Sequence, residues 1–172
     1  RQTPNSFTYT FEDTVNQNNY SISKKEGTLE ITPVMKKVTV TITGHTGGEK
    51  YNGAEQTVKG YDVAISDDLY TVNDFTFSGT DHVSGTNAKS YPMGLKTSNF
   101  TNINENFDAV EFVVQDGGLT IEKRVVTLTS GSASKAYDGT PLTNEEVSVS
   151  GDGFVSGEGA QYSNFASLTE VN

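Results

Sequence analysis

The sequence predicts an all-β chain of antiparallel strands, and three observations support this class. Apolar and polar residues alternate strictly in several stretches, β-branched and aromatic residues fill these stretches, and Gly, Asn and Asp separate them. Alternation with a period of two is typical of a strand with one buried and one solvated face. Half-buried strands of this kind occur mostly in antiparallel sheets.

The expected strands follow one another along the chain. Alternation marks residues 6–11 (SFTYTF), 38–43 (VTVTIT) and 147–150 (VSVS). Residues 106–118 are ambiguous on their own, because Phe107, Val110 and Val114 fall near helical spacing. An internal repeat, described next, favours a strand there.

Two segments of the chain end in the same way. Residues 18–33 (NNYSISKKEGTLEITP) and 106–123 (NFDAVEFVVQDGGLTIEK) each carry an aromatic after Asn, alternating residues, a charged-Gly turn and a Leu-x-Ile strand. Leu29 matches Leu119, and Ile31 matches Ile121.

Two other segments begin in the same way, residues 37–56 and 125–142. Val38-Thr39-Val40 matches Val126-Thr127-Leu128, and Tyr51-Asn52-Gly53 matches Tyr137-Asp138-Gly139. The matched positions lie 86 to 90 residues apart. This period suits tandem immunoglobulin-sized domains, so we expect antiparallel Ig-like β-sandwich modules in tandem.

The phase of the repeat divides the chain. Residues 36–124 form one complete unit, 1–35 the closing half of a preceding repeat, and 125–172 the opening half of a following one. We therefore expect a fragment cut across its repeats, unless the true domain phase is shifted from these motifs. Exposed half-sandwich faces and strand edges are costly. The halves are predicted to complement each other, within one chain or by strand exchange between chains in a homo-oligomer.

The same motifs carry a family resemblance over nearly the whole chain. Lys-x-Tyr-Asp-Gly-x-Pro-Leu at 135–142, VSVSGDGFVSGEGA at 147–160 and the ending Asn-Tyr-x-Ile…Gly-Thr-Leu-x-Ile-Thr-Pro resemble the MBG/YDG-type repeats of large bacterial surface proteins. NAKSYPMGL (87–95) is similar to the family's Gly-x-Tyr-Pro-Ile strand, with Ala88, Lys89 and Ser90 departing from it. The resemblance implies Ig-like modules strung as stalks or adhesive arms on the cell surface, and it supplies no catalytic residues.

The central unit is a diverged copy of this pattern. Asn52 stands in place of Asp, GAEQ (53–56) in place of Gly-x-Pro-Leu, and ISDDLYTVNDF (65–75) in place of the Gly-Asp-Gly-Phe loop. If any repeat has a binding surface of its own, we therefore expect it in this central unit.

The Tyr-Asp-Gly triplet reads as a turn and not as a catalytic group. A carboxylate that acts as acid, base or nucleophile cannot be exchanged for an amide, yet Asn52 occupies the position of Asp138. Asn-Gly and Asp-Gly are both formers of type I′ hairpin turns. We expect Tyr51 and Tyr137 to lay their rings over the sandwich edge and tie their hydroxyls to the backbone.

Acidic loops offer a candidate calcium site. Asp67, Asp68 and Asp74, and separately Asp152 with Glu158, lie near turns, but neither set has the ligand spacing of a calcium loop. We expect solvated loops and no cofactor, with weak calcium binding as the alternative.

Other chemistry has less support. His45 and His82 lie in polar Gly-rich stretches without a zinc-like ligand set, and no Gly-x-Ser-x-Gly elbow is present. An isopeptide cross-link between Lys36 or Lys37 and Asn106 is conceivable, although solvent-facing lysines are the commoner case.

Composition limits the partners. The formal net charge is -10, which disfavours nucleic acid and anionic lipid, and no apolar run approaches the length of a membrane helix. The chain has no cysteine, so disulfides and thiolate metal sites are excluded.

These observations together predict a non-enzymatic stalk or adhesin module on a bacterial cell surface, outside the cell. Its expected partners are neighbouring repeats of the same protein, without nucleic acid or membrane. The first alternative is a carbohydrate- or mucin-binding module that uses Tyr61, Tyr70 and Phe75 as stacking rings, although aromatics in strands are more often core. An enzyme is the second alternative. It would need a concave pocket into which several polar side chains point, and the sequence gives no sign of one.

Overall fold

The computed structural model describes residues 1–170, and they form an all-β structure of several small sheets. Three short 3-10 helices are the only helical elements among them. The elements are β1 (Gln2–Asn5), η1 (Gln17–Asn19), β2 (Gly27–Glu30), β3 (Val38–Gly44), β4 (Thr46–Gly47), β5 (Gln56–Lys59), β6 (Tyr61–Ile65), η2 (Val72–Asp74), β7 (Phe75–Phe77), β8 (His82–Gly85), β9 (Ser90–Pro92), η3 (Thr97–Asn99), β10 (Phe100–Asn102), β11 (Val110–Gln115), β12 (Gly118–Thr120), β13 (Val126–Ser130) and β14 (Val147–Gly151).

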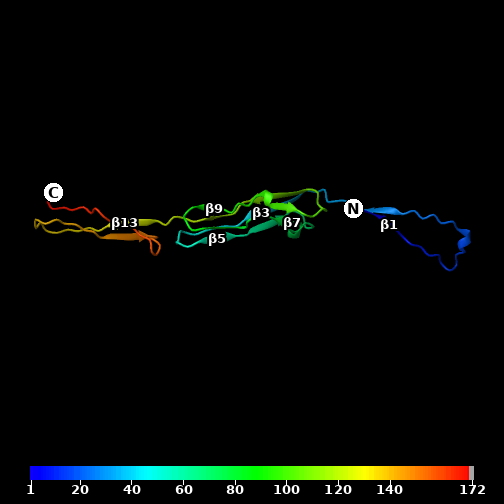
Figure 1. Ribbon diagram of the computed structural model, residues 1–172, viewed down its shortest axis with the longest axis horizontal. Helices are drawn as coiled ribbons and strands as arrows, with labels where there is room; N and C mark the ends of the chain where they lie inside the picture. Colours follow the sequence, from blue (N-terminus) through cyan, green and yellow to red (C-terminus); the bar gives the residue numbers. More distant parts are fainter. Residues whose placement is uncertain (171–172) are drawn as a thin grey trace.

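The molecule is elongated, with a thicker body between two thin hairpins (Figure 1). We call these parts the N-terminal hairpin (1–35), the central unit (36–124) and the C-terminal hairpin (125–170). The two hairpins lie at opposite ends of the central unit (Figure 1). No helix among the described residues has the length and apolar character needed to cross a membrane.

All the buried apolar side chains of the described residues belong to the central unit. Strand β3 crosses its middle, and its residues alternate between buried and half-buried because one face meets the core. Val38, Val40 and Ile42 are fully buried. The other members of the core are Tyr70, Phe75, Met93, Leu95, Phe100 and Phe107.

The pairing within the central unit is not wholly antiparallel, which differs from the prediction. Strand β3 pairs antiparallel with β6 but parallel with β11, in a register that joins Val38 to Val110 and Val40 to Phe112. Parallel neighbours need a long connection, and most of the unit lies between these two strands. The ambiguous stretch 106–118 thus contains strand β11, as the repeat predicted.

Two glycines allow this parallel ladder to continue from β3–β11 into β4–β12. A Cβ on Gly44 would lie 2.3 Å from the Gly117 amide nitrogen, and one on Gly117 would lie 2.4 Å from the His45 carbonyl oxygen. The two backbones therefore approach at a distance that only glycine permits. Beyond this point, β12 lies between β4 and β9.

The C-terminal hairpin repeats one pairing of the central unit. In β3–β6, Val40 pairs with Ile65 and Ile42 with Val63. In β13–β14, Leu128 pairs with Val149 and Ser130 with Val147. Leu128 matches Val40 in the sequence, so both matched strands pair antiparallel with a strand that follows later in the chain.

The N-terminal hairpin repeats another pairing of the central unit. Strands β9 and β12 pair Leu119 with Tyr91 and Gly118 with Pro92. Strands β1 and β2 pair Leu29 with Thr3 and Thr28 with Pro4, so a proline again lies one residue beyond the partner of the matched leucine. The matched leucines Leu29 and Leu119 therefore have the same position relative to a proline of the partner strand.

The two hairpins do not pair with each other within the chain. The β1–β2 and β13–β14 sheets are separate and two-stranded, and the hairpins extend in opposite directions (Figure 1). The within-chain alternative of the predicted complementation is therefore absent from this structure. Exchange between chains stays a prediction.

Candidate functional site

The central unit meets the C-terminal hairpin at a junction that has more hydrogen bonds than the other contact between parts of the described chain. Its frame is a backbone ladder at the end of β12. The Tyr51 amide donates to the Glu122 carbonyl at 2.8 Å, and the Glu122 amide to the Glu49 carbonyl at 3.1 Å. This ladder fixes residues 49–51 beside residues 121–125, which join β12 to β13 and which we call the connecting segment.

An ion pair joins the two parts. The Lys50 Nζ lies 2.8 Å and 3.0 Å from the two carboxylate oxygens of Asp152, which is 102 residues further along the chain. Asp152 Oδ2 also accepts a hydrogen bond from the Val125 amide at 2.8 Å. One carboxylate therefore holds both the central unit and the connecting segment.

Arg124 adds a second set of bonds from the connecting segment itself. Its Nε donates to the Gly153 carbonyl at 2.8 Å, one terminal nitrogen donates to the Asp152 carbonyl, and the other lies 3.4 Å from the Tyr51 carbonyl. A planar guanidinium with several donors suits such a multiple contact. It bridges the Tyr51 turn and the loop that follows β14.

The Tyr51 side chain completes the contact. Its hydroxyl donates to the Glu158 carboxylate, in place of the backbone partner that we predicted. Beside it, a Cβ built on Gly53 would lie 3.0 Å from the Val155 side chain, so the turn and the loop are closely packed. We call Lys50, Tyr51, Arg124, Asp152 and Glu158 the junction clamp.

Electrostatics follow this geometry. The hydrogen bond from Lys50 lowers the pKa of Asp152, and the Val125 amide lowers it further. The hydrogen bond to Glu158 raises the pKa of Tyr51 above its usual 10.0. At neutral pH the clamp therefore holds an ionised aspartate and a protonated tyrosine.

The two Tyr-x-Gly triplets adopt the same local turn. Asn52 Oδ1 accepts a hydrogen bond from the Ala54 amide at 2.9 Å, and Asp138 Oδ1 accepts one from the Thr140 amide at 2.9 Å. The following glycines, Gly53 and Gly139, have φ of 79° and 76°. The Asn52 amide and the Asp138 carboxylate therefore stabilise their turns in the same way.

The type of turn differs from the prediction. A type I′ turn needs positive φ at both central residues, and neither Asn52 nor Asp138 is among the positive-φ residues of the described chain. In both turns a residue with negative φ precedes a glycine near +80°, and the side-chain oxygen of that residue closes the turn. The glycine alone supplies the left-handed conformation.

The second triplet, Tyr137-Asp138-Gly139, is exposed to solvent. Tyr137 is 63% exposed and lines a shallow hollow with Leu142 and Leu168, so its ring does not cover a sandwich edge. Lys135 and Thr140 lower the pKa of Asp138 to about 2, since both donate hydrogen bonds to its carboxylate. This carboxylate is therefore engaged within its own turn.

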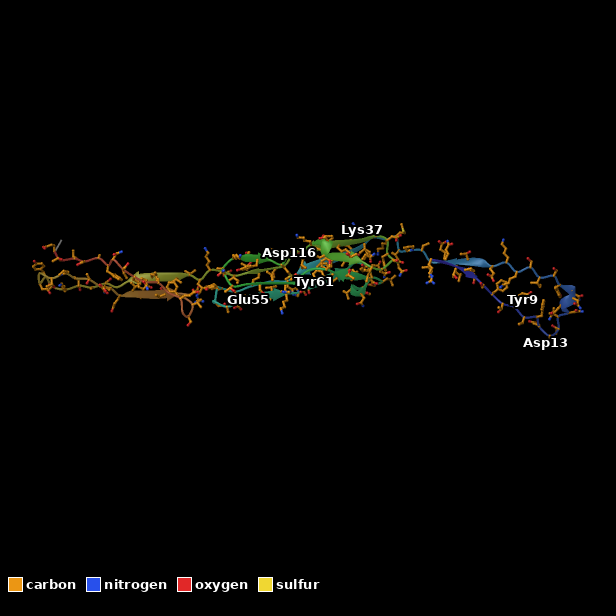
Figure 2. The ribbon with its side chains drawn as sticks, in the orientation of Figure 1. Tyr9, Asp13, Lys37, Glu55, Tyr61 and Asp116 are labelled. Carbon is orange, nitrogen blue, oxygen red and sulfur yellow. The ribbon has the colours of Figure 1, made fainter. Side chains whose placement is uncertain are left out.

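The rings proposed for carbohydrate stacking lie in the core. Tyr70 and Phe75 are buried, and their rings are stacked with centroids 6.5 Å apart. Tyr61 lies in the central unit (Figure 2) and is half-buried. The centroids of its ring and the Phe100 ring lie 5.5 Å apart, with the rings edge-on. The Tyr70 hydroxyl lies within hydrogen-bond distance of two acceptors, the Asp74 carbonyl at 3.0 Å and Asn102 Oδ1 at 2.9 Å. This burial counts against a sugar site at these residues.

The acidic residues considered for calcium have protein partners instead. Asp67 lies 3.4 Å from the Lys36 Nζ, and Asp74 bonds Thr71 and Asn104. Within residues 1–170, no group of three or more His, Asp or Glu side chains is arranged to hold a metal ion. Asp68 has no role in these contacts.

The histidines and the lysines proposed for an isopeptide bond also have other contacts. His45 lies 3.2 Å from Asp62, which raises the pKa of its ring, and His82 lies 3.4 Å from Asp81. Lys36 and Lys37 face Asp67 and Glu111 at the surface. Asn106 bonds Asn104, so the structure does not bring the proposed isopeptide partners together.

Sequence reasoning missed the two cations of the clamp, Lys50 and Arg124. It did single out Asp152 and Glu158, but as possible metal ligands. The available signal was charge complementarity: basic residues flank the end of the central unit, and an acidic glycine-rich loop follows β14. No family model, curated protein or solved structure matches the chain.

Proposed function

We propose that the chain is a non-enzymatic structural module of a bacterial cell-surface protein, built from tandem β-sandwich repeats of the MBG/YDG type. Its task is to hold successive repeats in line as a stalk outside the cell. The junction clamp is the observation that carries this proposal. Five side chains and a backbone ladder link the parts across a connection of a few residues, which is how a chain resists bending between domains.

The repeat interpretation rests on two agreements in strand pairing. Strand β13 pairs antiparallel with β14 as the matched strand β3 does with β6, and the β1–β2 hairpin has the pairing of β9–β12. Matching sequence motifs adopt matching pairings at both ends. The simplest account is that each flank is half of a unit like the central one.

The resemblance supplies the cell-surface setting, and the chemistry of the chain is compatible with it. Stability comes from sheet ladders and an aromatic core without cysteines. Threonine and serine line the exposed strand faces, and the net charge of -10 favours solubility. Neighbouring repeats of the same protein are the partners that this arrangement needs.

Carbohydrate or mucin binding is the rival function, and burial of Tyr70 and Phe75 removes its best candidate residues. No specific observation favours it over the stalk. No cofactor, nucleic acid or membrane enters the proposed role.

Small-angle X-ray scattering, extrapolated to zero concentration, tests the proposal. A stalk module should give an elongated particle whose maximum dimension matches the extended shape in Figure 1. Replacing Lys50 and Arg124 together with alanine should shorten and broaden the distance distribution. The stalk role would be overturned if the wild-type scattering profile were that of flexibly joined domains and the double substitution left it unchanged.

A further inference from the structure

We propose that Asn52 is a site of spontaneous covalent modification, at which deamidation through a cyclic imide produces isoaspartate and loosens the junction clamp. The reaction takes place within the turn and needs no partner other than water. Its effect on the clamp rests on the proposed stalk function and deepens it, since it gives the junction a chemical route by which it loosens with age.

The sequence favours this reaction at one position. Asn52 is the only asparagine in the chain that is followed by glycine. A glycine has no side chain to obstruct the approach of its own backbone nitrogen to the Cγ of the preceding residue. Asn52 and Gly53 are both exposed, so water and a base can reach them. Sequence and exposure together therefore favour attack at Asn52 over the other asparagines.

The turn brings the reacting groups together. The Ala54 amide donates a hydrogen bond to Asn52 Oδ1 at 2.9 Å. A side chain that is bonded to the amide two residues further on is folded over the intervening peptide, which contains the Gly53 nitrogen. The same bond stabilises the negative charge that develops on Oδ1 when Cγ is attacked. The Ala54 amide therefore both positions and polarises the side-chain carbonyl.

The two nitrogens that exchange places have no other partner. Within residues 1–170, the Gly53 amide donates no hydrogen bond to a protein acceptor, and neither does Asn52 Nδ2. An amide that is hydrogen-bonded would have to break that bond before it could lose its proton. The fold therefore restrains neither the nucleophile nor the leaving group.

The reaction has two steps. A base removes the proton of the Gly53 amide, the nitrogen forms a bond to Asn52 Cγ, and the bond from Cγ to Nδ2 breaks, so that Nδ2 takes a proton from water and leaves as ammonia. Water then adds to one imide carbonyl, and the bond from that carbon to the Gly53 nitrogen breaks. Addition at Cγ gives aspartate, whereas addition at the backbone carbonyl carbon of Asn52 gives isoaspartate. The net change is uptake of one water and release of one ammonia.

Asp138 shows that the aspartate product fits this kind of turn. Its Oδ1 accepts a hydrogen bond from the Thr140 amide at 2.9 Å, the distance that is also found in the Asn52 turn. Asp138 resists the same cyclisation, because an ionised carboxylate is a poor electrophile, and Lys135 and Thr140 lower its pKa to about 2. The two turns therefore form a reactive and an unreactive copy of one structure.

Isoaspartate has a different effect, because it lengthens the backbone by one carbon–carbon bond, about 1.5 Å. The junction has no room for this. A Cβ on Gly53 would lie 3.0 Å from the Val155 side chain, and the Tyr51 carbonyl lies 3.4 Å from a terminal nitrogen of Arg124. A closely packed contact cannot absorb such a displacement without moving its partners. The isoaspartate form must therefore lose part of the contact between the turn and the C-terminal hairpin.

Peptide mapping of the aged full chain tests the site. The protein is incubated at mildly alkaline pH, digested with trypsin at slightly acidic pH and analysed by mass spectrometry, with an unaged sample as the blank. Cleavage after Lys50 and Lys59 releases the peptide 51–59, and electron-transfer fragmentation distinguishes isoaspartate from aspartate. We expect Asn52 to deamidate at least tenfold faster than Asn87, an exposed asparagine that is followed by alanine.

Amide exchange followed by NMR tests the effect on the clamp. The Tyr51 amide donates to the Glu122 carbonyl at 2.8 Å and reports on the ladder that frames the junction. We expect this amide to exchange at least tenfold faster in the purified isoaspartate form than in the unaged chain. Asn52→Asp, incubated in the same way, is the matched control, because it carries the same new charge on an unaltered backbone. Its Tyr51 amide should exchange like that of the wild type.

Equal rates of deamidation at Asn52 and Asn87 would overturn the inference. An isoaspartate form whose Tyr51 amide exchanges like that of the unaged chain would also overturn it. Scattering from the unaged chain tests the stalk alone, so the two proposals can fail separately.

Discussion

Lys50 and Asp152 lie 102 residues apart in the sequence and form a bidentate ion pair, with the Lys50 Nζ 2.8 Å and 3.0 Å from the carboxylate oxygens. The pair crosses from the central unit to the loop after β14. Asp152 also binds the Val125 amide in the connecting segment. The geometry of the junction is therefore set by side chains on both of its sides.

Acid should loosen this junction. The folded-state pKa of Asp152 is lowered from 3.8, so its contribution is fully present above that value and is lost as the pH falls through the lower folded-state pKa. Amide exchange of Val125, followed by NMR from pH 6 downward, should lose protection in this window. The effect should be absent in Asp152→Asn, which has no charge to titrate; equal pH dependence in both proteins would contradict this account.

The turn at Asn52 should accept aspartate and reject alanine. Asn52→Asp keeps the acceptor that binds the Ala54 amide, as Asp138 does for Thr140, whereas Asn52→Ala removes it. We expect little change in the free energy of unfolding for the first variant and a loss of about 0.5–1 kcal/mol for the second. Urea denaturation measures both. A larger loss in Asn52→Asp would show that the amide has a role of its own.

The glycine contact in the central unit should be intolerant of any side chain. Gly117→Ala puts a Cβ against the His45 carbonyl, and we expect a loss of about 1–3 kcal/mol or more, which is typical of overpacking. Thermal unfolding of the dilute monomer gives the value. Gly27→Ala is the control there, because its Cβ has open space in the single chain. Equal melting temperatures for the two variants would contradict the close approach of the strands.

The buried Tyr70 hydroxyl should matter for stability. Tyr70→Phe keeps the ring but removes the hydroxyl contacts with the Asp74 carbonyl and Asn102, which keep the Ile103 and Asn104 amides as donors, so we expect a cost of about 0.5–1.5 kcal/mol. Tyr162→Phe, at a 37% exposed residue of the C-terminal hairpin, is the control and should cost nothing measurable. If a glycan array found binding that Tyr70→Phe abolished without loss of stability, the core assignment would be wrong.

His45 should show a raised pKa in the folded state. Its ring lies 3.2 Å from Asp62, and its Nδ1 donates a second hydrogen bond to the Lys59 carbonyl. The bond to Asp62 raises the pKa above 6.5, so the stabilisation is present below that value and is lost as the pH rises through the folded-state pKa. NMR titration of the ring, with Asp62→Asn as the comparison, measures the shift; identical titration of both proteins would refute the pairing.

Period-two alternation predicted the all-β class and the strands at residues 38–43 and 147–150, but the strand that it predicted at residues 6–11 is absent, and Phe7 and Tyr9 are exposed there. Val38, Val40 and Ile42 are fully buried as a strand with one core face requires. The repeat also resolved the ambiguous segment, where Val110–Gln115 is a strand. Local pattern and internal repetition act on neighbouring residues, and both are visible in a single sequence.

Pairing partners were harder to predict. The parallel contact between β3 and β11 joins residues 72 positions apart, Val38 and Val110, and nothing in the local pattern records strand direction. The turn type also escaped prediction, because Asn-Gly suits more than one turn and the φ of Asn52 depends on the chain that follows.

The clamp could be predicted only in part. Asp152 and Glu158 were visible as acidic loop residues, and their role depended on which cations the fold brings beside them. Lys50 and Arg124 reach them through the Lys50–Glu122 bridge and the short connecting segment, which are tertiary features. Tyr70 and Phe75, the rings of the alternative binding function, lie in the core, which is the commoner place for aromatic residues of strands.

The most direct test of the stalk is a distance distribution across the junction by pulsed electron paramagnetic resonance. Spin labels at Lys59→Cys in β5 and Thr127→Cys in β13 occupy exposed positions on either side, and the chain has no other cysteine. A stiff junction predicts one narrow distribution that broadens in Lys50→Ala but not in Lys37→Ala, whose ion pair with Glu111 lies within the central unit. A broad wild-type distribution, unchanged by Lys50→Ala, would contradict the proposal that this chain is a rigid stalk module.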